Sequence, residues 1–409
     1  MKIAILSDFH LGFAEGTERA DEAFDQASQA LKLALENNAE IILHAGDLFD
    51  EDVPSQETWE KTFRLFSMLT SRACNAVVVK EKDGVKEEFC FSRIPVVAIH
   101  GTHEARGRDF KNALEVLESA GVLVHLHAAT ASFENLVMHG LSGVPEKKSL
   151  DALKMWNPVP VFGKKNVVLL HQSIKDYLPF DDDMIATISL SDLPTGFDLI
   201  VNGHLHWCSK EEMQGKTLVM PGSTVLTQMK RLEAEKRKGI FMWDCDSGSL
   251  DFIEMSNQRK FFYCKLEFKE AGQEEVYAAV EKEINSILAN SFEQKPLVKL
   301  KLKGSLARGL RQSDLSFRKL LAGFSERAII SVDTGFEEIS FAKKLDELRA
   351  VQSERKSITA MGLDLLEKNL AQTDFSNAFD VREFFSLFSE GMVDEAVERL
   401  SVLKPNQKV

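Results

Sequence analysis

The chain has 409 residues, of which 44% are hydrophobic and 28% charged, and its formal net charge is -13 at pH 7. This length predicts two or three domains, and the composition is that of an ordinary soluble globular protein. The acidic balance argues against a protein that coats nucleic acid non-specifically. It does not exclude a nuclease, because bound divalent cations can dominate the electric field of a site.

No targeting or membrane-spanning segment is expected. Residues 2–6 are typical of a strand and follow neither a charged n-region nor an apolar h-region. No uninterrupted apolar run approaches the ~20 residues of a membrane span. The five cysteines are scattered and form no Cys-x-x-Cys pair. This pattern predicts reduced thiols in a cytoplasmic protein rather than a disulfide framework or a zinc ribbon.

The N-terminal part of the chain alternates between apolar runs of strand length and stretches of helical period. In chain order we expect a strand at 2–6, a helix at 17–37, a strand at 41–43, a helix from residue 54, a hairpin at 77–91, a strand at 94–99 and a helix at 109–119. Short strands follow at 122–126, 132–138, 167–170, 199–201, 218–220 and 240–243. The whole predicts an α/β (α+β) domain over residues 1–254, with two sheets packed face to face and helices outside.

Residues 255–336 are predicted to form a small cap domain with the element order β-α-β-α-β. Its strands are expected at 261–268, 297–302 and 328–332, and its helices at 274–290 and 314–322. The middle strand alternates, so three lysines share one face. They are candidates for contact with a DNA backbone, although a solvated face explains them equally well. These residues are Lys299, Lys301 and Lys303.

Residues 337–409 are predicted to be a linker followed by a hairpin of two helices. Asp380 is the expected N-cap of the first helix, with Glu383 at the capping-box position. The second helix is expected at 392–403. Two short helices cannot bury their own apolar side chains, so this hairpin requires a partner. The side chains in question are Phe384, Phe385, Phe388, Val393, Val397 and Leu400.

Metal-capable side chains follow several expected strands, at the edge where an open α/β sheet binds its ligands. In the central stretch an apolar run at 41–43 turns at Gly46 and delivers Asp47. Similar junctions occur at Asp8-Phe9-His10, Gly101-Thr102-His103-Glu104, Leu170-His171-Gln172 and Gly203-His204-Leu205-His206, with Pro221-Gly222-Ser223 following. We predict that Asp47 bridges two metal ions and that these segments supply the other ligands.

The residue types in these segments suit a two-metal phosphoesterase site. Because a strand has a period of two, Asp8 and His10 are expected on one face, where they can chelate one ion, and His204 and His206 likewise. Carboxylates with imidazoles favour manganese, iron or zinc over calcium. A bridging carboxylate holds two ions ~3.5–4 Å apart, so that they clamp both reacting oxygens of a phosphate. His103 remains as the free imidazole that donates a proton or stabilises an oxyanion.

Together these motifs resemble those of the calcineurin-like metallophosphoesterases over residues 1 to about 250. Within that family they are most similar to the nuclease subunit of the DNA double-strand-break repair complex, the SbcD type of bacteria and its archaeal and eukaryotic counterparts. The narrower similarity rests on Leu6-Ser7-Asp8-Phe9-His10-Leu11-Gly12, on Ala45-Gly46-Asp47-Leu48-Phe49-Asp50 and on the junctions at 170–172, 203–206 and 221–223. The cap and the terminal hairpin fit the same layout.

The resemblance implies two manganese ions and manganese-dependent hydrolysis of DNA phosphodiesters, exonucleolytic on duplex ends and endonucleolytic on single strands. By position, the first ion would be held by Asp8, His10, Asp47 and His206. The second would be held by Asp47, Thr102, His171 and His204. His103 falls at the position of the catalytic histidine. The implied partners are DNA, a second copy of the chain, and a coiled-coil ATPase that binds the terminal hairpin.

Thr102 departs from the pattern of the family, which has an asparagine ligand at that position. A threonine hydroxyl can bind a hard cation, but it is shorter and a poorer donor than an amide oxygen. Our hypothesis is therefore a weakened second metal site rather than an inactive enzyme.

Two other functions remain open from the sequence. A phosphatase or a cyclic-nucleotide phosphodiesterase would use the same catalytic layer, although the stretch ending at Asp50 lacks the following Arg-Gly of protein phosphatases. A scaffold that lost activity through Thr102 and only tethers the ATPase is the non-enzymatic alternative.

A basic run at 230–238 contains glutamates, so a solvated helix face explains it as well as phosphate binding does. The histidines interpreted as structural are His44, His100, His125, His127 and His139.

Overall fold

The computed structural model describes residues 1–107, 110–177, 187–213 and 215–336, and after them 362–363, 366–367, 369, 380–389 and 397. The chain divides into two compact units. The first contains Met1–Cys264, Ser286–Lys299 and Gly323–Ser331; the second contains Lys265–Asn285, Leu300–Ala322 and the residues from Val332 onward. Among the described helices, none combines the length and apolar character that crossing a membrane requires.

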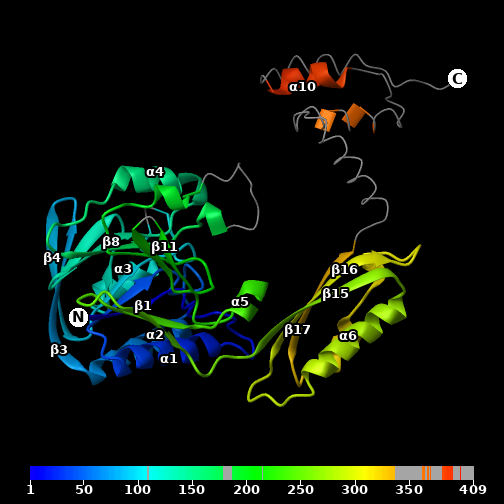
Figure 1. Ribbon diagram of the computed structural model, residues 1–409, viewed down its shortest axis with the longest axis horizontal. Coiled ribbons are helices and arrows are strands. Elements are labelled where there is room, and N and C mark those ends of the chain that lie inside the picture. The colour runs from blue at the N-terminus through cyan, green and yellow to red at the C-terminus, as the bar shows by residue number, and fades with distance from the viewer. Residues whose placement is uncertain are drawn as a thin grey trace. The chain divides into compact units, whose positions relative to one another are not determined.

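Six strands form the first sheet (Figure 1). Their spatial order is β14 (Leu250–Glu254), β13 (Gly239–Asp244), β1 (Lys2–Leu6), β2 (Ile41–Ala45), β5 (Val96–Ile99) and β6 (Val124–His125). The last four are mutually parallel, whereas β13 pairs antiparallel with β1, and β14 pairs antiparallel with β13. The carboxyl ends of β1, β2 and β5 therefore lie at one edge of the sheet.

Eight strands form the second sheet. Their order is β11 (Ser209–Met213), β12 (Lys216–Met220), β10 (Leu199–Asn202), β9 (Lys165–Leu170), β8 (Leu136–Leu141), β7 (Ala129–Phe133), β3 (Ala73–Lys82) and β4 (Val85–Arg93). The central strands β8, β9, β10 and β12 are parallel, and antiparallel strands flank them. The carboxyl ends of β9 and β10 again lie at one edge.

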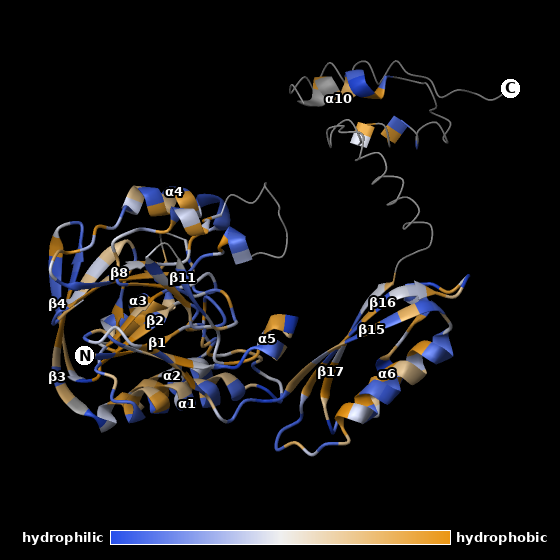
Figure 2. Cartoon of the chain, in the orientation of Figure 1, coloured by the Kyte–Doolittle hydropathy of each residue, from blue (hydrophilic) through white to orange (hydrophobic). Residues whose placement is uncertain are grey.

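The two sheets pack face to face. Alternate apolar side chains of a strand point into the core between the sheets and toward the outer helices. Along β1, Ile3 and Ile5 join the core between the sheets, whereas Ala4 and Leu6 face the helices. Helices α1 (Glu22–Glu36), α2 (Gln56–Ser67) and α3 (Ala113–Ser119) cover the outer face of the first sheet, and α4 (Glu146–Trp156) packs on the second. Figure 2 shows the hydrophobic strands inside and hydrophilic residues on the helices.

The predicted α/β class with two packed sheets and flanking helices is confirmed. The first helix, expected from residue 17, begins at Glu22, because Thr17 uses its hydroxyl to bond the Ala14 carbonyl and forms a turn instead. The strand expected at 132–138 is two strands, β7 and β8, joined by a turn at Glu134, whose φ is 50°. Helix α4 and strands β11 and β14 were not predicted.

A smaller three-stranded sheet has the order β15 (Phe261–Ala271), β16 (Leu297–Leu306) and β17 (Ile329–Phe336). With α6 (Gln273–Ile287) and α7 (Arg318–Ala322) it has the expected order β-α-β-α-β. Leu300 and Leu302 of β16 are buried, Lys299 and Lys301 are half-buried and Lys303 is exposed, as the alternation predicts. The domain limits at residues 254 and 336 stay a prediction.

Helix α10 (Val381–Ser389) begins at the predicted cap, since Asp380 Oδ1 accepts the backbone N–H of Glu383 at 3.2 Å. Phe385 is 44% exposed, as expected, whereas Phe384, which was expected to be exposed, is buried. The expected linker at 337–359 and most of the second helix at 392–403 lie outside the described residues.

Gly140 of β8 lies at a close approach of the two sheets. A Cβ at this position would lie 2.5 Å from Leu126 Cβ and 2.9 Å from Ile99 Cγ2. We expect Gly140→Ala to lower the free energy of unfolding by about 1–3 kcal/mol, because the added methyl group forces the sheets apart. A lower urea midpoint would report it. Gly107→Ala is the control, since its Cβ would meet nothing closer than Phe110 Cδ2 at 3.8 Å; identical midpoints for both variants would contradict the close packing.

Candidate metal centre

Six metal-capable side chains converge at the carboxyl ends of strands from both sheets. From the first sheet come Asp8 and His10 after β1, and Asp47 after β2. From the second sheet come His171 after β9, and His204 and His206 after β10. They form two clusters, each with a carboxylate from the first sheet and at least one imidazole from the second.

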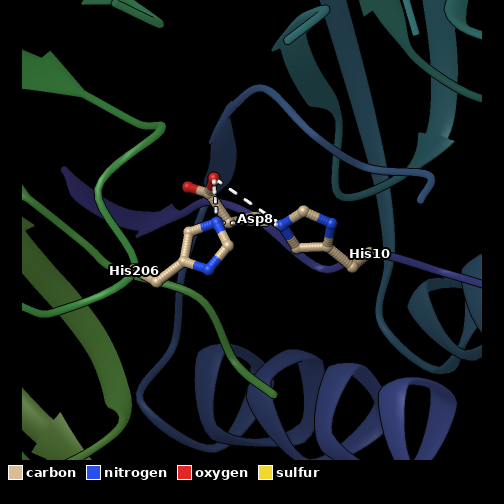
Figure 3. Close-up of side chains that lie close together, drawn as sticks. All are labelled: Asp8, His10 and His206. Carbon is tan, nitrogen blue, oxygen red and sulfur yellow. Dashed lines mark hydrogen bonds and ion pairs between the residues drawn. The ribbon is translucent and has the colours of Figure 1, made fainter. Parts of the chain in front are cut away.

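Asp8, His10 and His206 form the first cluster (Figure 3). The Nε2 atoms of the two histidines are 3.2 Å apart, and they lie 4.0 Å and 3.8 Å from Asp8 Oδ1. Figure 3 shows both rings directed toward the carboxylate. All three side chains are at most 5% exposed, so the nitrogen lone pairs and the carboxylate share a small enclosed space.

Asp47, His171 and His204 form the second cluster. Asp47 Oδ2 lies 3.1 Å from His171 Nε2, and the rings of His171 and His204 are 5.2 Å apart. The clusters are connected, because the backbone N–H of His204 donates to both carboxylate oxygens of Asp8 at 3.1 and 3.2 Å. The structure thus places all six side chains in one buried region.

The backbone brings these residues together in a way that the pleat of a strand does not explain. β1 ends at Leu6, so Asp8 and His10 lie beyond the strand and not on one face of it. Their φ values are 53° and 49°, and Asp47 and His204 have values of 50° and 75°. Residues other than glycine rarely adopt this left-handed conformation, and such strain concentrates at functional sites.

The expectation that His204 and His206 chelate one ion as a pair is wrong in its geometry. His204 belongs to the cluster of Asp47, and His206 to the cluster of Asp8. The reason is that β10 ends at Asn202, after which the left-handed turn at His204 directs the two rings to different places. The division agrees with the ligand sets that the family resemblance implies.

Three glycines leave the space that the second cluster occupies. A Cβ on Gly46 or Gly203 would overlap the His171 ring, and one on Gly101 would overlap the Asp47 carboxylate. Gly46 also has a φ of 96°, which favours glycine. Any larger residue at these positions would displace Asp47 or His171.

Each clustered histidine has one ring nitrogen engaged by a neighbour. The partners are the Asp50 carboxylate for His10 at 2.9 Å, the Ala45 carbonyl for His171 at 2.7 Å, the Ser173 hydroxyl for His204 at 3.0 Å and the Thr227 hydroxyl for His206 at 2.6 Å. The second nitrogens of His10 and His206 face each other at 3.2 Å, and that of His171 faces Asp47 Oδ2 at 3.1 Å. Histidines that bind metals are oriented by partners of this kind.

The buried carboxylates have strongly shifted pKa values. Burial raises the pKa of Asp8 to about 6 and that of Glu104 to about 8. Burial acts in the same direction on Asp47, but the His171 imidazolium outweighs it and lowers the pKa of Asp47 well below its usual range. Burial lowers the pKa of His171, and the Asp47 carboxylate in turn raises it to about 10. The proton on His171 thus supplies the positive charge that Asp47 requires, and a cation between them would supply the same charge.

The residues of both clusters fit divalent cations. His171 Nε2 is buried and faces Asp47 Oδ2 at 3.1 Å, but the pair lacks the geometry of a hydrogen bond. His10 and His206 direct two nitrogens into one space, next to a carboxylate whose pKa burial has raised. A buried carboxylate without a cation is unfavourable, and nitrogen with oxygen ligands suits first-row transition metals.

His103 lies beside the first cluster and is 42% exposed. Its Nδ1 atom is 2.6 Å from the Asp50 carbonyl oxygen, and its ring is 4.8 Å from that of His10. The backbone N–H of His103 donates to Asp47 Oδ1 at 2.9 Å. Thr102 is exposed, and within the described part of the chain no hydrogen bond joins its hydroxyl to either cluster.

Several supporting residues were not predicted from the sequence. Glu104 accepts the backbone N–H groups of Phe49 and Gly101 and so ties the loop after β2 to the loop after β5. Asn202 exchanges two hydrogen bonds with the backbone of Gln172 and ties the loops after β9 and β10. Glu104 stands inside a segment singled out from the sequence but had no predicted role, and Asn202 directly precedes another such segment.

Lys238, expected on a solvated or phosphate-binding face, is 4% exposed. It follows helix α5 (Arg231–Glu235), and its ammonium donates to the His206 carbonyl at 2.7 Å and pairs with Glu233 at 3.2 Å. Lys238 is buried rather than solvated because Glu233 is itself buried and requires a cation as its partner. Lys238 therefore holds the loop that carries His206.

The fold and the site define a metal-dependent phosphoesterase. The sequence profile of the calcineurin-like phosphoesterase family matches residues 1–208, and the chain belongs to that family. Members of this family use divalent metals, which agrees with the donor atoms of the two clusters.

The chain is similar to several curated proteins. DNA double-strand break repair protein Mre11 of Sulfolobus acidocaldarius is 25% identical over 314 residues, which cover 75% of this chain and 76% of that protein. The protein of the same name from Archaeoglobus fulgidus is 26% identical over 406 residues, covering 93% and 83%. Double-strand break repair protein MRE11 of Homo sapiens is 27% identical over 311 residues, and the chain spans 42% of its length.

Thr227 offers a test of the first cluster. Thr227→Val keeps the volume but removes the hydrogen bond to His206 Nδ1, so we expect divalent-metal affinity to fall about 10–100-fold. Calorimetric titration with Mn²⁺ would measure it. Thr70→Val is the matched control, because the Thr70 hydroxyl bonds only the Ser67 carbonyl on an exposed turn. Equal affinities for both variants would show that the hydrogen bond from Thr227 to His206 does not support metal binding.

Proposed function

We propose that the chain is a manganese-dependent nuclease that hydrolyses DNA phosphodiesters in double-strand-break repair, as an exonuclease on duplex ends and an endonuclease on single strands. The observation that carries the proposal is the pair of connected clusters beside the exposed His103. The repair proteins to which the chain is similar support the choice of DNA as substrate.

Bound divalent cations would polarise the phosphodiester and activate water. On this proposal the ligands of the first ion are Asp8, His10, Asp47 and His206. Those of the second are Asp47, Thr102, His171 and His204. Asp8, His10, Asp47, His171 and His206 are buried, which excludes competing water and strengthens their interaction with a cation.

His103 is proposed to act on the phosphate itself. Since its Nδ1 atom is committed to the Asp50 carbonyl, Nε2 is the atom left to face a substrate. From there it can donate a proton to the leaving oxygen or a hydrogen bond to a non-bridging one. The carboxylate of the same Asp50 bonds His10, so one residue fixes the distance between the metal cluster and the proposed acid.

The later parts of the chain are proposed to contact the partners. Lys299, Lys301 and Lys303 of β16 are proposed to contact the DNA backbone, which their placement on one strand face supports. A coiled-coil ATPase is proposed to bind the terminal helices, and the capped helix α10 with its exposed Phe385 supports this. The homodimer is proposed on the resemblance alone.

The nuclease activity is tested with end-labelled duplex DNA, a labelled single strand and Mn²⁺. We expect His103→Leu to reduce cleavage by about 10²–10⁴-fold, the scale of one general acid. Mn²⁺ affinity should be retained, because His103 is not a proposed ligand, and calorimetry would check this. Asp47→Asn is the contrasting variant, which should lose both Mn²⁺ binding and cleavage.

The same assay separates the alternatives. Hydrolysis of a phosphomonoester or a cyclic nucleotide without cleavage of either DNA would replace the nuclease with a small-molecule phosphoesterase. Binding of Mn²⁺ without hydrolysis of any of these substrates would favour the non-enzymatic scaffold over both kinds of enzyme. Cleavage that is equal in wild type and His103→Leu would remove His103 from the mechanism.

Thr102→Asn tests the hypothesis of a weakened second site. An amide oxygen is a longer and better neutral donor, so we expect the weaker of two Mn²⁺ dissociation constants to improve about tenfold, a difference of about 1.4 kcal/mol. Calorimetry would resolve the two sites, with Thr70→Asn as the matched surface control. If Thr102→Asn and wild type bind equally, the threonine does not weaken the site.

A further inference from the structure

A cavity of about 410 Å³, separate from the metal centre, lies beside the loop at residues 100–107, which also carries His103. None of the proposed metal ligands lines this cavity. Side chains from β3, the loop, α3 and β6 form its wall. The groups that matter are Lys80, Lys82, Arg106, Phe110, His125 and His127.

The carboxylates in the wall are already neutralised. Glu118 is paired with Lys80 at 2.8 Å and also accepts the backbone N–H of His125 at 2.7 Å. Glu115 is paired with Lys111 at 3.1 Å and closes the capping box of α3. These acids therefore have little charge left for a cation in the cavity.

Positive charge remains available to a ligand. Lys82 is exposed and forms no ion pair within the described structure. The carboxylate nearest to Arg106 is that of Asp52, at 3.7 Å and 55% exposed, and Arg106 Nη1 donates weakly to the Lys111 carbonyl at 3.4 Å. A charge-assisted hydrogen bond from such groups to a phosphate is stronger than one between neutral groups. The cavity is thus built for an anion.

The histidines add hydrogen-bonding capacity to the same wall. His100 Nδ1 is 2.9 Å from His125 Nε2, and the rings of His100 and His127 are 5.1 Å apart. His127 Nδ1 is buried and has no partner in the described structure. A buried polar atom of this kind is costly unless a ligand or water satisfies it. A phosphate or hydroxyl group in the cavity would do so.

The rim provides an aromatic surface. Phe110 is 63% exposed, and the Arg106 guanidinium lies 4.9 Å from the centre of its ring. An exposed aromatic ring next to arginine is the usual platform on which a nucleobase stacks. The volume lies within the roughly 300–1,000 Å³ of small-ligand sites.

The geometry points to a nucleotide-binding pocket separate from the metal centre, with the phosphate at Lys82, Arg106 and His127 and the base on Phe110. The ligand is either a free mononucleotide or one nucleotide unit of a strand. This goes beyond the proposed function, because the pocket requires neither metal nor cleavage. Its loop is shared with His103, so an occupied pocket would lie next to the proposed acid.

Binding is measured by calorimetry on the full chain in EDTA, with dAMP, inorganic phosphate and a 5′-phosphorylated single-stranded oligonucleotide as probes. We expect Phe110→Ala to weaken dAMP binding by about fivefold or more, the lower end of what a base stack provides. Lys82→Ala should weaken dAMP and phosphate alike. Both residues are exposed, so the variants should fold. Matched controls are Lys86→Ala on the same hairpin and Phe162→Ala, which is fully exposed.

Each outcome is decisive. Binding of dAMP that Phe110→Ala and Lys82→Ala weaken supports a free mononucleotide, and binding of the oligonucleotide alone with the same dependence supports a unit of a strand. Equal binding of phosphate and dAMP, unaffected by Phe110→Ala, would overturn the nucleotide. No binding of any probe would overturn the pocket. Since no metal is present, these results are independent of the DNA cleavage assay.

Discussion

The buried contact between Asp47 and His171, 3.1 Å apart, is the interaction on which the rest of the structure depends. It joins a carboxylate that follows a strand of one sheet to an imidazole that follows a strand of the other. Three glycines keep the space around it clear, and Glu104 anchors the backbone on one side. A carboxylate buried this deeply is tolerated only because a positive charge lies next to it.

The sequence was informative wherever a local pattern determines local structure. Short apolar runs identified most strands of the two sheets, and the junctions after them marked the residues that the structure brings together. The backbone at those junctions was not predictable, because Asp8 and Asp47 adopt left-handed conformations that only the surrounding packing enforces. Hence the two-residue period of a strand predicts that His204 and His206 bind one ion together, whereas the folded chain places them in different clusters.

Supporting contacts were the least visible from the sequence. Asp50 stands inside a motif, but Thr227 and Lys238 lie far along the chain from His10 and Asp47. Nothing in a run of lysines and glutamates reveals that Lys238 is buried against Glu233 and the His206 carbonyl. Such contacts are long-range, and they depend on how the two sheets are aligned rather than on any local propensity.

Both clusters take ligands from both sheets, and this has a consequence for the fold as a whole. A cation bound there would cross-link the two sheets of the sandwich. Only the assembled sandwich offers the full donor set, so each ion that binds would favour the native state in proportion to its occupancy. The same six side chains would thus contribute both to catalysis and to the stability of the sandwich. Removal of the ions would lower the free energy of unfolding as well as the activity.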